Sequence, residues 1–229
     1  MPNSSTLILA KRSLKLNKAN SAMGIFLAAI GLLAFDVLPF FYFDALAVLV
    51  LLAVPFMVLG IFIFSTPVSL LYVYDKNNGV LEYLISLGWN QGDIFKRYLK
   101  AALFLGLILF TVELSITMIV DIFAGAQAYI LHDLAWLTLI AGFGLSVVSF
   151  VTMAMIAFSS LQRSVGGNAN SPLGLALGGL LILPTFYIQA FSYDIGVLVD
   201  LAIPTLAGGV SILLLVLSSR LIRREKMLP

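Results

Sequence analysis

The sequence has no cysteine and a single histidine, His132, among its 229 residues. The absence of cysteine excludes disulfides, thiolate nucleophiles, zinc–cysteine sites and iron–sulfur clusters, and one imidazole cannot form a histidine pair on a metal. His132 precedes Asp133, a pair more typical of a surface histidine beside a helix N-cap than of half a metal site. We therefore expect no metal and no cofactor in this chain.

Charge is also scarce: 10% of the residues are charged and 61% are hydrophobic, with a mean hydropathy of +1.09. Soluble domains contain about 25% charged residues, so this composition indicates a membrane protein. A bilayer-spanning helix needs about 20 apolar residues. Six runs satisfy this, approximately Ala22 to Phe41, Leu46 to Tyr72, Leu99 to Ala124, Leu134 to Leu161, Pro172 to Phe191 and Ile195 to Leu217. The predicted fold is an all-α polytopic membrane protein with six transmembrane helices.

The thirteen lysines and arginines all fall on one face of this arrangement. They precede the first span, lie between the second and third spans and between the fourth and fifth spans, and follow the sixth span: Lys11, Arg12, Lys15, Lys18, Lys76, Lys96, Arg97, Lys100, Arg163, Arg220, Arg223, Arg224 and Lys226. Because cytoplasmic loops carry the positive excess, we expect a multi-pass protein of the cell membrane with both termini in the cytoplasm.

Three regions follow from this topology. Residues 1–21 form a cytoplasmic amphipathic segment, residues 22–218 form the transmembrane domain with a cytoplasmic segment at 73–98, and residues 219–229 form a basic cytoplasmic tail. The N-terminal region predicts an interfacial helix over Ser4 to Lys18, and a frayed basic tail is the alternative. Its apolar side holds Leu7, Ala10 and Leu14, and its basic stripe holds Lys11, Lys15 and Lys18.

The segment between the second and third spans predicts a helix, a tight turn and a second helix. Apolar residues recur at helical spacing from Val80 to Ile85, and Gly88 suits the left-handed position that ends a helix. Asn90 can cap the second helix, with Asp93 at its third position. This second helix continues without a breaker into the third span, so movement of the turn would reach the membrane through a stiff helix.

A family resemblance lies in the run Asp75-Lys76-x-x-Gly79-x-Leu81-Glu82-x-Leu84-Ile85-Ser86. It resembles the cytoplasmic segment of ABC type-2 (ABC-2) exporter permeases, a family with six spans, an amphipathic N-terminal helix, a coupling helix between the second and third spans and small external loops. The chain departs from the family pattern in Val80, usually threonine, and Gly88, often proline. The permeases of ABC importers and of lipoprotein-release systems have similar segments. The importer pattern has a proline after the second helix, which this chain lacks, and the lipoprotein-release type has four spans.

The resemblance implies a permease subunit of an ABC exporter, paired with a second permease copy, identical or related, and bound to cytoplasmic ABC ATPase subunits. The ATPase-coupling residues would be Asp75, Gly79, Leu81, Glu82, Leu84, Ile85 and Gly88. The three aliphatic side chains would enter a cleft of the ATPase, and the two acids would face its basic groups. No G-x-x-x-x-G-K-[ST] sequence occurs, so ATP and Mg²⁺ would bind to the partner and this chain would not be an enzyme. The alternative is that this segment is only a solvated helical hairpin that joins the second and third spans.

Polar residues inside the third span offer a second interpretation. Glu113 lies near its middle, and Thr117 and Asp121 follow at i+4 and i+8 on one face. A charged carboxylate at the bilayer centre costs about 3 kcal/mol, so Glu113 should not face lipid. It either belongs to a translocation path or proton-linked site, or is protonated and hydrogen-bonded to a neighbouring helix. An ATP-independent six-span transporter or channel using Glu113 and Asp121 is the alternative function.

Other features concern the later spans and the partners. Small residues at Gly142, Gly174 and Gly178 predict close helix packing, and the resemblance makes Pro184 a hinge lining the path, with an ordinary kink equally compatible. An intramembrane hydrolase would need a nucleophile turn of G-x-S-x-G type, which the sequence lacks. Membrane lipid is an expected partner. Nucleic acid is not, because no aromatic and basic platform lies outside the membrane.

Overall fold

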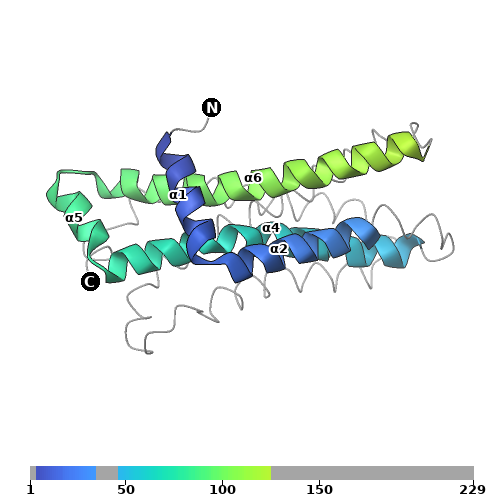
Figure 1. Cartoon of the computed structure of the whole chain (residues 1–229), viewed down its shortest axis with the longest axis horizontal. Helices are drawn as coiled ribbons and strands as arrows, with labels where there is room; N and C mark the ends of the chain where they lie inside the picture. The colour runs from blue at the N-terminus through green and yellow to red at the C-terminus, as the bar shows by residue number, and fades with distance from the viewer. Residues whose placement is uncertain (1–3, 35–45, 125–229) are drawn as a thin grey trace, which may run out of the picture.

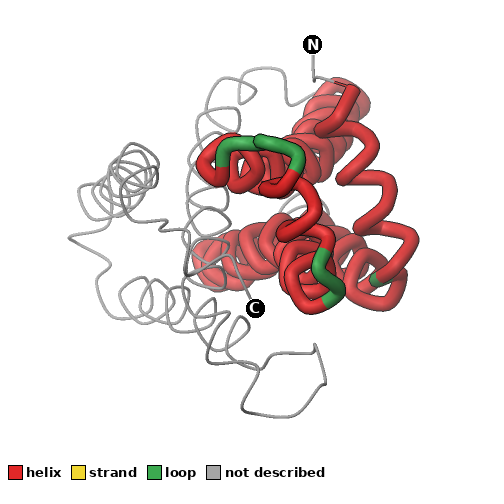
Figure 2. The backbone as a smooth tube through the Cα atoms, turned by 90° about the vertical axis from the view of Figure 1, so that its left-hand side faces the viewer, coloured by secondary structure: helices red, strands yellow, loops and turns green. Residues whose placement is uncertain are grey.

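The computed structural model describes residues 4–34 and 46–124. Within these ranges every regular element is an α-helix: α1 (Ser4–Leu16), α2 (Lys18–Leu32), α4 (Leu46–Asn77), α5 (Val80–Ser86) and α6 (Gln91–Phe123). Figure 2 views the molecule from the end that carries α5, where short turns join α5 to α4 and to α6. The all-α class is therefore confirmed for this part of the chain. The predicted fourth to sixth spans, the basic tail and Gly142, Gly174, Gly178 and Pro184 lie outside it.

Two of the described helices are long and apolar enough to cross a membrane, over Phe56–Asn77 in α4 and Gln91–Phe123 in α6. Helix α4 begins at the predicted start of the second span and continues to Asn77, and α6 covers the predicted third span almost to its end. The shorter apolar helix α2 covers the first part of the predicted first span. The length and composition of these two helices thus support membrane association. The total of six spans stays a prediction.

Helices α2 and α4 run antiparallel, and their backbones approach very closely (Figure 1). A Cβ atom added to Gly24 would lie 2.6 Å from the backbone nitrogen of Phe64, and one added to Gly60 would lie 2.9 Å from the backbone nitrogen of Ala28. Gly24 and Ala28 are four residues apart, which is the spacing by which small residues form a packing face on a membrane helix. The packing glycines predicted from the sequence, Gly142, Gly174 and Gly178, belong to later spans, and the pairing of α2 with α4 is not among the predictions.

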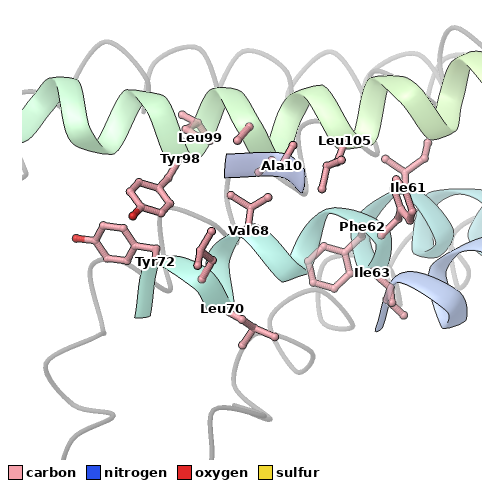
Figure 3. Close-up of a cluster of buried hydrophobic side chains, with 14 of the residues drawn as sticks. Ala10, Ile61, Phe62, Ile63, Val68, Leu70, Tyr72, Tyr98, Leu99 and Leu105 are labelled. Atoms are coloured by element: carbon pink, nitrogen blue, oxygen red, sulfur yellow. The ribbon is translucent and has the colours of Figure 1, made fainter. Parts of the chain in front are cut away.

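The core lies mainly between α4 and α6 (Figure 3). Val68 of α4 and Leu99 and Leu105 of α6 are buried there, and Ala10 of α1 lies between the two helices. Helix α1 crosses α4 and α6 near the end at which α5 connects them (Figure 1). The predicted N-terminal helix therefore forms, ending at Leu16, and it packs on both long helices.

Candidate functional site: the coupling segment and its anchor

The turn between α5 and α6 is closed by the backbone. The amide of Trp89 donates to the carbonyl oxygen of Leu84 at 3.1 Å, and the amide of Gly88 donates to that of Ile85 at 3.0 Å. These two bonds form a Schellman motif, in which the residue after the helix is left-handed. Gly88 has a φ of 86°, as predicted, and this angle excludes proline, whose φ is fixed near −65°. Proline, which ABC-2 permeases often have at this position, therefore does not fit this turn.

Helix α6 begins where the sequence predicts. The side-chain oxygen of Asn90 accepts a hydrogen bond from the Gly92 amide at 3.0 Å, and Asp93 lies in the first turn, where a negative charge favours the helix dipole. The guanidinium of Arg97 lies 4.1 Å from the ring centroid of Trp89, a cation–π contact that fastens the turn to α6. Helix α6 is unbroken over its 33 residues.

The side chains that α5 exposes are not the ones predicted to contact the ATPase. Leu81 is fully buried inside this chain, and Leu84 and Ile85 are partly buried against the same core. Leu81 is therefore corrected from a partner contact to an internal anchor of α5. The apolar side chains that α5 and its turn expose are instead Tyr83, Leu87 and Trp89, which we name the coupling surface.

Asp75 requires a second correction. Its carboxylate is fully buried and accepts two hydrogen bonds from Arg12, at 2.8 Å from Nη2 to Oδ1 and at 3.2 Å from Nη1 to Oδ2. The hydroxyl of Tyr98 donates to Oδ2 at 2.6 Å. Asp75 is therefore occupied within the chain and does not face a partner's basic groups. Glu82, in the first turn of α5, stays partly exposed and remains available for that role.

These residues form a cluster that joins three helices, which we name the Asp75 cluster: Arg12 of α1, Tyr72 and Asp75 of α4, and Tyr98 of α6. The two tyrosine rings meet edge to face, with centroids 5.2 Å apart (Figure 3). A buried carboxylate is costly unless it is paired and hydrogen-bonded, and here it is both. The cluster therefore fixes the point at which α1 crosses the base of the coupling segment.

Three members of this cluster are not predicted as site residues from the sequence: Arg12, Tyr72 and Tyr98. Arg12 is one of many basic residues that set the predicted topology, Tyr72 ends the predicted second span, and Tyr98 ends the predicted cytoplasmic segment. The signal was Asp75 itself, since an acid beside an apolar run needs a counter-charge. Its partner is 63 residues away, however, and spacing along the chain does not select it.

The polar stripe of α6 faces the protein interior. Glu113 and Thr117 are fully buried and Asp121 is nearly so, which agrees with the expectation that Glu113 avoids lipid. Both carboxylate oxygens of Glu113 lack a hydrogen-bond partner among the residues that the structure describes. The bond to a neighbouring helix that a purely structural role would require is thus not found in residues 4–34 and 46–124.

No protein-family model matches the chain, and neither the curated proteins nor the solved structures contain a significant match to it. The family resemblance of the coupling segment therefore remains a prediction.

Proposed function

We propose that this chain is the transmembrane permease subunit of an ABC-type exporter, working with a second permease copy and with cytoplasmic ABC ATPase subunits. The observation that carries the proposal is the coupling surface: Tyr83, Leu87 and Trp89 are exposed at the tip of a helix–turn–helix that continues into a membrane-length helix. The helices that this segment joins are the two long apolar helices of the described structure.

Exposed apolar side chains on a water-facing segment favour a protein partner. Tyr83 is 64% exposed and Leu87 is 58% exposed, whereas Leu81 is buried and Leu84 and Ile85 are partly buried. Tyrosine and tryptophan are enriched at protein interfaces, and contiguous exposed apolar side chains mark contact sites. The partly exposed Glu82 adds a charge that a basic residue of an ATPase would pair with.

The segment is built to transmit movement rather than absorb it. The Schellman motif closes the turn, the Arg97–Trp89 contact fastens it to α6, and Leu81 anchors α5 to the core. A displacement of the coupling surface would therefore move α6 as a unit. ATP and Mg²⁺ would bind to the partner, and this chain would supply the path and the mechanical link.

The test is the substitution Leu87→Asp. It places a carboxylate in the proposed contact without altering a buried residue or a predicted span. Burying a leucine contributes about 2 kcal/mol, so we expect the affinity for the ATPase to fall about 30-fold. The measurement is co-purification of the tagged chain from membranes of its own cells, with any bound ATPase identified by its Walker sequence, followed by titration of the isolated partner.

The matched control is Leu16→Asp, the same substitution at an exposed leucine of α1 outside the coupling segment. It should leave ATPase binding unchanged. A wild-type chain that purifies without any Walker ATPase, or a Leu87→Asp variant that binds it as tightly as the wild type, would contradict the proposal.

One observation favours a second candidate, an ATP-independent transporter or channel. Glu113 is fully buried, with both oxygens unpartnered among the described residues, as in a site that awaits a proton or a cationic group. If the chain is an ATP-independent transporter or channel, Glu113→Gln would abolish solute flux in reconstituted vesicles without ATP, and Leu87→Asp would leave that flux unchanged. The ABC proposal expects the reverse order of sensitivity.

A further inference from the structure

A hollow of about 440 Å³ lies between α1 and the early part of α6, away from the coupling surface. Its apolar walls come from both helices: Leu7, Ala10, Leu14, Phe104, Leu105 and Ile108. Three lysines complete the lining, all from the N-terminal region: Lys11, Lys15 and Lys18. Figure 1 shows how α1 crosses α6 here, and Figure 3 shows two of the lining residues, Ala10 and Leu105, in the core.

The wall of the hollow is almost wholly apolar, so the lysines line it with their alkyl stems, and no acidic residue from the described part of the chain lies in the lining to balance their ammonium groups. Arg12 turns inward to Asp75, whereas the three lysines are exposed along the hollow. A ligand that matches both the apolar walls and the three lysines has an apolar body and an anionic head. The volume is within the range of about 300–1,000 Å³ that ligand sites have.

We propose that this hollow binds an anionic phospholipid, with an acyl chain against α6 and the phosphate at the lysines. The location favours a lipid over a soluble anion, because Phe104 and Ile108 belong to a membrane-length helix and the walls are apolar. Lysine ammonium groups bind phosphate as point charges, and the cytoplasmic leaflet is the one rich in anionic lipids. The inference requires membrane association and does not depend on an ATPase partner.

The first arm of the test is charge. The purified full chain in detergent is titrated with palmitoyl-oleoyl phosphatidylglycerol and, separately, with the zwitterionic phosphatidylcholine of the same chains, and bound lipid is counted by native mass spectrometry. We expect phosphatidylglycerol to be retained preferentially. Removing two lysines by Lys11→Gln with Lys15→Gln should weaken its retention about 30-fold at low salt, at about 1 kcal/mol for each lysine.

The matched control for charge is Lys96→Gln with Lys100→Gln, which removes the same charge from exposed positions of α6 outside the hollow. It should change retention by less than about twofold, since these side chains do not line the site. An equal loss in the two double variants would mean general attraction of lipid to a basic surface, and would overturn the proposal.

The second arm is shape. Ile108→Trp fills the hollow, and Ile116→Trp makes the same change on α6 outside it; both isoleucines are 40% exposed. Phosphatidylglycerol should be lost from the first variant and kept by the second. Inorganic phosphate is the third probe: displacement of the lipid by phosphate at equal concentration would identify a simple anion site and overturn the lipid assignment, as would equal retention of the two lipids.

Discussion

A carboxylate at the end of an apolar helix needs a counter-charge, and Asp75 obtains it from α1. Arg12 binds both of its oxygens and Tyr98 donates a third hydrogen bond. Bidentate arginine–carboxylate pairs fix geometry as well as charge. At the residue scale, this cluster is what attaches the N-terminal helix to the base of the coupling segment.

We expect Arg12→Met to loosen α1. The Asp75 carboxylate would keep only the Tyr98 hydroxyl, and because Arg12 is 43% exposed, water would compensate part of the loss, leaving a cost of about 1–3 kcal/mol. Limited trypsin digestion should then cut α1 at its lysines several-fold faster than in the wild type. Adding Asp75→Leu removes the stranded carboxylate and should restore resistance in part.

The control for this digestion is Arg97→Met, which removes an arginine that stacks on Trp89 and takes no part in the cluster. Cleavage of α1 should be unchanged in it. If Arg12→Met resists trypsin as the wild type does, packing alone holds α1 in place.

Residue-scale prediction from the sequence succeeded where the chemistry is local. The left-handed Gly88 and the Asn90 cap each follow from three or four neighbouring residues. It did not identify the Arg12–Asp75–Tyr98 contacts, because the order of residues does not reveal which of many cations reaches a buried acid. The same limit applies to Leu81, whose burial depends on where α5 folds back.

At the scale of elements, the described helices α2 and α4 approach so closely that their contact has no room for added volume. Any side chain at Gly24 would overlap the backbone of Phe64. We expect Gly24→Leu to force the helices apart and to lower the stability of the purified protein by about 1–3 kcal/mol or more. Thermal unfolding in detergent, followed by size-exclusion chromatography, measures this.

Ala29→Leu is the matched control, since Ala29 is exposed on the same helix. It should unfold at the wild-type temperature. A Gly24→Leu variant that also does so would mean that α2 can shift at no cost.

Helix boundaries at this scale were largely predictable, since apolar runs, Gly79, Gly88 and Asn90 mark where α4, α5 and α6 begin or end. The choice of helix neighbours was not. Small residues occur in most of the apolar runs, and periodicity alone does not state which runs pair. The Gly24–Phe64 contact is therefore information that three-dimensional packing adds.

At the scale of the whole molecule, the described lysines and arginines belong to α1, the start of α2, the end of α4 and the start of α6, and α1 and α5 lie toward the same end (Figure 1). A cytoplasmic position of this end stays a prediction from the charge pattern. The absence of cysteine makes single labels simple to place. We expect Asn78→Cys to react with an impermeant maleimide only after the cells are opened. Phe123→Cys, 87% exposed at the opposite end of α6, should react in intact cells. Labelling of Asn78→Cys in intact cells would contradict the orientation.

The number of spans and the pairing of two permease copies depend on the chain beyond residue 124, and they stay predictions. Composition and the one-sided charge pattern predict a polytopic protein because the bilayer imposes helix length and apolarity. How the helices are arranged around a path, and what Glu113 meets there, depend on contacts between distant segments.

The Asp75 cluster also imposes an order on biosynthesis. Asp75 is made 63 residues after Arg12, and Tyr98 a further 23 residues after Asp75. At a translation rate of about 5–20 residues per second, the arginine waits several seconds for its acceptor. During that interval α1 cannot dock, because α4 is incomplete and α6 has not yet been synthesised. Of the described helices, α1 is thus synthesised before the others and is among the last to reach its final position.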